Sequence, residues 1–191
     1  AQQESFINSF KYNEILLSSA NSLKKTEMAD KAAALMLKSA STSTDIHKAC
    51  NNIIFASKKV NKLDEVQEKL ENIESPTKKE IILLSNIYDQ MGEIDTAFEI
   101  IENEISKTPN SELFLEQKLH LSKKNREWEQ AILTLSQISK LSSKHKAMRI
   151  KDLVELSLKA DQTEEALKWI ATWKKIPASS TTPHIQEASI Y

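Results

Sequence analysis

The sequence predicts an all-α fold, an α-solenoid in which about five helix–turn–helix units stack along the chain. Three observations predict it. The 191 residues contain one Gly and four Pro, whereas β-hairpins and phosphate-binding loops depend on glycine at positive φ. Apolar residues recur at helical spacing. A short motif also recurs roughly every 34 residues, which is the period of a two-helix repeat.

The recurring motif places acidic or polar residues before Ala or Val, followed by an apolar stripe. It occurs at Leu63–Val66, Ile94–Ala97, Trp128–Ala131 and Thr163–Ala166, and more loosely at Ala29–Ala32. The final residues of these segments are separated by 34, 31, 34 and 35 positions, taken in chain order from residue 32. Prolines keep the same period, since Pro76 and Pro109 lie 33 positions apart and Pro177 follows 68 later.

The clearest unit spans residues 78–111, and its two helices have explicit start and stop signals. Thr77 and Glu80 have the spacing of a capping box. Gly92 is expected to end the first helix in the left-handed conformation, and Pro109 follows the end of the second. The apolar faces of the two helices consist of Ile81, Leu84, Ile87 and Tyr88, and of Ile94, Ala97, Phe98, Ile101 and Ile105.

This unit resembles the tetratricopeptide repeat. The resemblance rests on Ile81, Leu84, Ser85, Tyr88, Gly92, Ala97, Ile101 and Pro109, with Glu104 in place of the family's second small residue. It is degenerate in the other four units and spans roughly residues 13–178. It implies a right-handed superhelix whose array covers 1–178, with units of approximately 1–45, 46–77, 78–111, 112–146 and 147–178. Residues 179–191 are expected to form an irregular tail or to begin a further helix.

Composition excludes several classes of function. The formal net charge is −1, from 26 basic and 27 acidic residues, which argues against nucleic acid as the main partner. No apolar run approaches the length of a membrane span, and the lone Cys50 permits no internal disulfide. His47 and Cys50 lie at i, i+3, but zinc needs more ligands. We expect no catalytic residue, no metal and no cofactor, and therefore no enzyme.

The resemblance implies that a protein or peptide partner binds in a concave groove lined by the first helix of each pair. Asparagine side chains there would bond the backbone of an extended segment, while apolar neighbours hold its side chains. The predicted partner-binding residues are Asn21, Asn51, Asn52, Phe55, Lys79, Ile82, Asn86, Gln117, His120 and Lys151.

The family's carboxylate clamp for chaperone tails is not expected. Asn21, Asn52 and Lys79 fall on three of its positions, but Leu17 and Leu83 stand where two further cations are needed. Without those cations a terminal carboxylate loses most of its charge-assisted hydrogen bonds.

Aromatic and basic residues have two interpretations each. Trp128, Trp169 and Trp173 are expected to pack in the core, the alternative being an aromatic docking patch. The lysine pairs that begin at Lys24, Lys58 and Lys123 are expected to complement helix C-terminal dipoles. The alternative is a basic ridge that attracts an acidic partner segment.

The predicted function is a non-catalytic protein–protein interaction or assembly scaffold. One alternative is a regulatory or substrate-recruiting segment of a larger multidomain enzyme, and another is self-association through an end helix. The residues Ala1-Gln2-Gln3 resemble those left after signal-peptide cleavage. They favour a bacterial protein exported to the periplasm over a cytoplasmic one.

Overall fold

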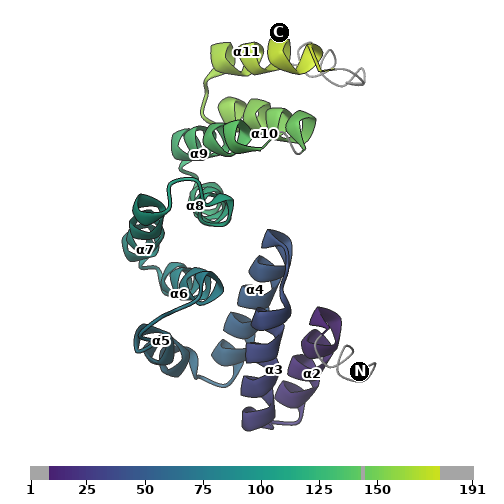
Figure 1. The fold of residues 1–191 in the computed structure, drawn as a ribbon, viewed down its shortest axis with the longest axis vertical. Helices are drawn as coiled ribbons and strands as arrows, with labels where there is room; N and C mark the ends of the chain where they lie inside the picture. The colour runs from purple at the N-terminus through teal and green to yellow at the C-terminus, as the bar shows by residue number, and fades with distance from the viewer. Residues whose placement is uncertain (1–8, 143–144, 177–191) are drawn as a thin grey trace. The chain divides into compact units, whose positions relative to one another are not determined.

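The computed structural model describes residues 9–142 and 145–176, and within these ranges all regular structure is α-helical (Figure 1). The predicted all-α fold is confirmed. The described helices are α2 (Phe10–Ser22), α3 (Thr26–Ser39), α4 (Ser43–Lys59), α5 (Leu63–Glu71), α6 (Lys78–Met91), α7 (Ile94–Lys107), α8 (Glu112–Lys124), α9 (Trp128–Leu141), α10 (Lys146–Lys159) and α11 (Thr163–Lys174).

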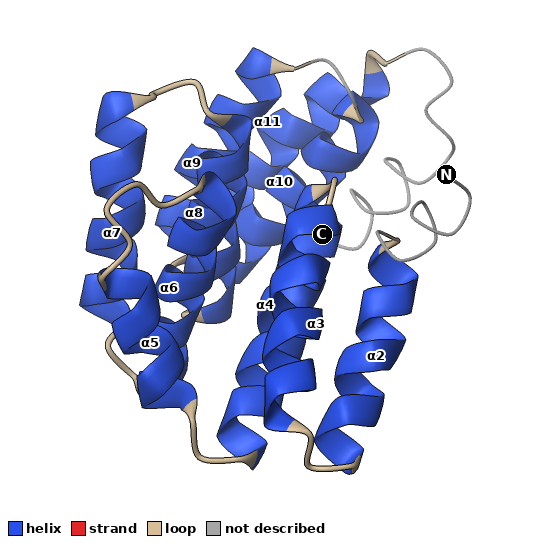
Figure 2. Ribbon diagram, turned by 60° about the horizontal axis from the view of Figure 1, so that its bottom comes forward, coloured by secondary structure: helices blue, strands red, loops and turns tan. Residues whose placement is uncertain are grey.

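The chain divides into two compact units, Ala1–Asn103 and Glu104–Tyr191. In the first unit α2, α3 and α4 lie side by side (Figure 2), α6 packs against α3 and α4, and α5 contacts α4 and α6. In the second unit α8 packs against α9, α9 against α10, and α10 against α11. Within each of these two sets, consecutive helices thus pack as neighbours, as expected for TPR-like helix pairs that bury their apolar faces by stacking.

One turn geometry joins the two helices of every described pair. Residues with left-handed φ between 54° and 88° occupy these turns, at Lys24, Asn61, Gly92, Arg126 and Asp161. In each turn the next residue donates its backbone N–H to the carbonyl five positions earlier, at 2.8 to 2.9 Å. The left-handed residue itself donates its N–H to the carbonyl three positions earlier. The two hydrogen bonds together form a Schellman motif. The backbone repeats five times, although glycine occupies the turn once.

The turn positions show which alanine of the first unit is equivalent to Ala97 and Ala131. The predicted repeat aligns Ala32 with Ala97 and Ala131. In the later pairs, however, the small residue follows the left-handed residue by five positions, as Ala97 follows Gly92. Counting five from Lys24 gives Ala29. The residue equivalent to Ala97 is therefore Ala29, and the predicted alignment of Ala32 is wrong by three positions. Both alanines are buried, so their spacing alone did not show which of them is equivalent.

Helix starts are fixed by local hydrogen bonds. The predicted capping box is confirmed at α6, where the Thr77 backbone N–H donates to Glu80 Oε2 at 2.7 Å and the Thr77 hydroxyl accepts from the Glu80 N–H. A second capping box, formed by Thr42 and Asp45, begins α4. The Asp45 carboxylate accepts from the Thr42 N–H at 3.3 Å. Both boxes satisfy backbone donors that the first turn of a helix leaves unpaired.

The small residues of the recurring motif lie buried in the helix packing. Ala97, Ala131 and Ala166 are fully buried, as the repeat predicts, whereas Val66 is half-buried. In the second unit Ala131 and Ala166 belong to two apolar clusters. Trp173 is buried in one of them and Trp169 packs against both, which confirms core packing for these tryptophans.

A lysine side chain links α6 to the C-terminal end of α3 through backbone carbonyls. Lys79 Nζ donates to the carbonyls of Lys38 and Ala40, at 2.8 and 2.6 Å. Both bonds place a positive charge where the helix dipole is negative.

Neither the two chain ends nor the exact boundaries of the repeat units can be compared with the described helices. The residues on which the predicted leader remnant and C-terminal tail fall, 1–3 and 179–191, lie outside the described ranges. The predicted boundaries of the five units stay a prediction.

Candidate functional site

A groove between α2 and α4 brings together three of the predicted partner-binding residues. It has a volume of ≈ 260 Å³ and lies within the first compact unit. Its lining residues are Glu14, Leu17, Ser18, Asn21, Ser22, Asn52, Phe55, Ala56 and Lys59. Asn21, Asn52 and Phe55 belong to the predicted set, and Asn51 lies beside them on the exposed surface of α4. We call this surface the α2–α4 groove.

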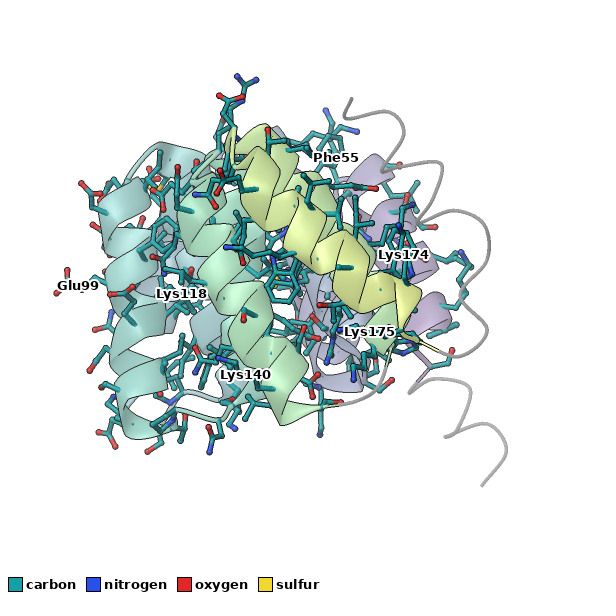
Figure 3. All side chains as sticks on the ribbon, turned by 90° about the horizontal axis from the view of Figure 1, so that it is seen from above. Phe55, Glu99, Lys118, Lys140, Lys174 and Lys175 are labelled. Atoms are coloured by element: carbon teal, nitrogen blue, oxygen red, sulfur yellow. The ribbon has the colours of Figure 1, made fainter. Side chains whose placement is uncertain are left out.

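Phe55, which is labelled in Figure 3, stands out in the groove because 71% of its surface is exposed. Its two predecessors on α4, Ile53 and Ile54, are buried in the helix packing. Phe55 therefore does not belong to the core stripe of α4. Aromatic side chains are enriched in protein contact surfaces, which makes Phe55, beside the amides of the groove, a candidate contact residue.

The one carboxylate that lines the groove is already neutralised. The Glu14 carboxylate forms ion pairs with Lys48 at 2.8 Å and with Lys11 at 3.2 Å. The hydrogen bond from Lys48 outweighs partial desolvation, and with Lys11 it holds the pKa of Glu14 below its ordinary value. The Asn52 amide also donates to Glu14, at 3.5 Å. Glu14 is thus a fixed anion that orients Asn52 and links α2 to α4.

The remaining predicted residues do not join this groove. Ile82, Asn86 and Gln117 are buried, and the Asn86 amide donates to the Ile82 carbonyl at 2.8 Å. They lie inside the helix packing instead of lining a surface. Helix α6 carries four consecutive apolar residues, Ile81–Leu84, so sequence periodicity did not show which of its faces is covered.

The other predicted residues of this set are exposed or half-buried. Lys79 is occupied by the α3 carbonyls described above. His120 and Lys151 lie on α8 and α10 in the second unit, where Lys151 pairs with Glu155 at 3.5 Å.

The predicted partner-binding set omits two charged residues of the groove, Glu14 and Lys59, although Lys59 belongs to the lysine pair that begins at Lys58. A signal for Lys59 was present, since it follows Phe55 by four positions and residues at that spacing share a helix face. No comparable signal marked Glu14, because its role depends on Lys48, which is distant in sequence.

A second cavity of ≈ 220 Å³ lies in the first unit and is lined by residues from α2 to α6. It shares Leu17, Asn21 and Ala56 with the α2–α4 groove. Its walls are mostly aliphatic and alanine side chains, including Ala29 and Ala33 from α3 and Val66 and Leu70 from α5. None of the residues of α5 is fully buried. The α2–α4 groove differs by presenting amides together with an aromatic ring, which suits a peptide backbone better.

Cys50 is not a reactive thiol in this structure. It is fully buried on α4, and burial raises its pKa to about 12. A thiol with such a pKa is protonated at neutral pH and is a poor nucleophile.

Two further chemistries find no support in the described part of the chain. Among those residues, no group of three His, Cys, Asp or Glu side chains is placed to hold a metal ion. None of the described helices combines the length and apolarity needed to cross a membrane.

Comparison with known proteins finds similarity to solved structures but to no known sequence family. No protein-family model matches the sequence, and no curated protein matches it either. The crystal structure of PilW, a widely conserved type IV pilus biogenesis factor, is similar over 98% of this chain and 84% of that chain, with a TM-score of 0.52 and 10% identity. A structure from the functional characterisation of Pseudomonas aeruginosa pilF has a TM-score of 0.46 and 15% identity, over 95% and 82% of the two chains. The likeness to PilW shows a shared helical-repeat fold.

Proposed function

We propose that the protein is a non-catalytic interaction or assembly scaffold that binds an extended segment of a partner protein in the α2–α4 groove. One observation carries the proposal: Phe55 is 71% exposed in a groove that also presents the amides of Asn21 and Asn52.

The chemistry of the groove suits a peptide backbone. A side-chain amide both donates and accepts hydrogen bonds, so Asn21 and Asn52 match the alternating N–H and C=O groups of an extended chain. Phe55 supplies apolar area that becomes buried on binding, and aromatic side chains of this kind dominate the binding energy of many interfaces. Leu17 adds an aliphatic floor.

The wider architecture supports a scaffold. We propose that the five described helix pairs are five repeats with the predicted boundaries, because each pair contains the same Schellman turn. Stacked helix pairs present a surface along which a partner segment binds.

We also propose an exported, periplasmic location. PilW, which shares the fold, is a type IV pilus biogenesis factor, and cell-surface assembly is one setting for such a scaffold. Fractionation of the native host tests this location, and recovery of the protein in the cytoplasm alone would contradict it.

Photo-crosslinking tests the groove and identifies the protein that occupies it. Phe55 is replaced by p-benzoylphenylalanine in cells that naturally make the protein, and crosslinked species are identified by mass spectrometry. The matched control is the same replacement of Leu133, which is 67% exposed on α9. We expect a discrete heterologous adduct from position 55 and none from position 133. Equal crosslinking at both positions, or no crosslinking at either, would contradict partner binding in the α2–α4 groove.

A further inference from the structure

We propose that the segment bound in the α2–α4 groove is acidic, with an internal Asp or Glu pairing with Lys59 and an adjacent apolar side chain covering Phe55. This inference rests on the proposed function and adds the chemistry of the partner.

Of the ammonium groups in or near the groove, those of Lys11, Lys48 and Lys58 already have partners. Lys11 and Lys48 are both paired with Glu14, at 3.2 and 2.8 Å. Lys58, the neighbour of Lys59, donates to the side-chain carbonyl of Gln90 at 3.0 Å. Lys59 lines the groove, and no carboxylate within the described ranges pairs with it. The groove therefore presents one ammonium group whose charge the described part of the protein does not neutralise.

Lys59 and Phe55 present a positive charge and an aromatic ring on the same helix. Lys59 follows Phe55 by four positions on α4, so both side chains lie on one face of the helix, and both line the groove. A partner that presents a carboxylate next to an apolar side chain matches this pair. The carboxylate replaces water at the ammonium group, and the apolar residue covers the ring.

The charges of the groove favour an acidic segment over a basic segment or a chain terminus. A basic segment has no available anion, because the one carboxylate of the lining set, Glu14, already has two lysine partners. A chain terminus is disfavoured as well, since recognition of a terminal carboxylate needs several converging donors with positive charge and Lys59 is a single one. The amides of Asn21 and Asn52 instead suit a backbone that continues past Phe55.

The test uses two synthetic probes with blocked ends. Both are fluorescein-labelled, amidated hexapeptides: the first is Glu-Leu-Ser-Gly-Glu-Leu, and in the second each Glu is replaced by Gln. Fluorescence anisotropy gives Kd for each probe at low and high salt. We expect the Glu probe to bind on the order of tenfold more tightly than the Gln probe, and its advantage to shrink as salt rises.

Variants assign that preference to one lysine. Lys59→Gln should make the two probes bind equally, whereas Lys25→Gln, an exposed lysine outside the groove lining, should keep the preference. Phe55→Ala should weaken both probes. If Lys59→Gln retains the preference for Glu, the role of Lys59 is overturned.

The remaining outcomes separate the inference from the function on which it rests. If wild type binds both probes equally and Phe55→Ala weakens both, the peptide groove stands and the acidic partner is overturned. If wild type binds neither probe, both proposals are contradicted.

Discussion

At the scale of single residues, the turns between paired helices carry the repeat. Gly92 adopts φ of +88° and Arg126 adopts +61° in equivalent turns. A left-handed conformation costs a residue with a Cβ about 1 kcal/mol more than it costs glycine. Sequence reasoning found Gly92 because glycine marks such a turn. The 34-residue period also places Arg126 at the equivalent position, although nothing about arginine itself signals left-handed backbone.

Replacing Arg126 by glycine should therefore stabilise the fold. We expect Arg126→Gly to raise the free energy of unfolding by about 0.5 kcal/mol, after part of the gain is offset by the greater freedom of glycine in the unfolded chain. The reverse change, Gly92→Ala, should lower it by about 1 kcal/mol. Space is not the cause of that loss, since nothing lies within 4 Å of a Cβ at Gly92. Urea unfolding of both variants measures the changes, and a destabilised Arg126→Gly would contradict the shared turn.

The charge of Glu14 gives a prediction about pH. Lys48 and Lys11 lower the pKa of Glu14. This contribution to stability is present above the ordinary pKa of a glutamate and is lost as the pH falls through the lowered value. Lys48→Met should raise the Glu14 pKa toward its ordinary range. Carboxyl carbon NMR titration of wild type and variant measures the shift, and an unchanged midpoint would show that Lys48 does not hold this anion.

At the scale of helices, buried polar contacts fix how neighbouring elements meet. Arg149 is 9% exposed on α10, and its guanidinium donates to the carbonyls of Ile138 and Ser142 at the end of α9, at 3.3 and 3.0 Å. It also pairs with Glu112 at the start of α8. One side chain on α10 therefore pairs with groups on both α8 and α9.

Removing that guanidinium should be costly. We expect Arg149→Met to lower the free energy of unfolding by about 2–3 kcal/mol, because buried acceptors lose their donors. Lys151→Met, on the exposed face of the same helix, should change it by less than about 1 kcal/mol. Equal effects in urea unfolding would show that the Arg149 contacts do not stabilise the junction.

The packing of α9 provides a second test at this scale. Ala131 is fully buried, whereas Leu133, two positions later, is 67% exposed. Ala131→Glu should cost about 3 kcal/mol or more, because it places an unpaired charge between packed helices. Leu133→Glu should leave the melting midpoint, measured by circular dichroism, nearly unchanged. Similar midpoints for the two variants would show that the buried face of α9 is misplaced.

The sequence predicted helices better than it predicted their faces. Caps, the turn glycine and the recurring alanines are local signals, so α6, α7 and α9 were predictable in type and position. The buried position of Ile82 and Asn86 was not predictable, because α6 is apolar on more than one face. In the groove, Asn21, Asn52 and Phe55 were predicted, but the pairing of Glu14 with Lys48 depends on contacts between helices that no single segment encodes.

At the scale of the molecule, one backbone plan recurs in segments whose sequences differ. The left-handed turn is occupied by Lys, Asn, Gly, Arg and Asp in the five pairs, yet the closing hydrogen bond keeps the same length within 0.1 Å. A helix pair cannot bury its apolar face alone, so the stacking of neighbours selects the turn even where the residue does not favour it. The fold thus supplies the rigid helices on which Phe55 and its neighbouring amides are presented.

The most direct test of this repeated plan is the backbone φ angle at the five turn residues, obtained from NMR chemical shifts and intraresidue HN–Hα NOEs. Positive φ is expected at Lys24, Asn61, Gly92, Arg126 and Asp161, with helical shifts on both sides of each. Negative φ at Arg126 and Asp161, or strand-like shifts in the segments between the turns, would contradict an array of helix pairs.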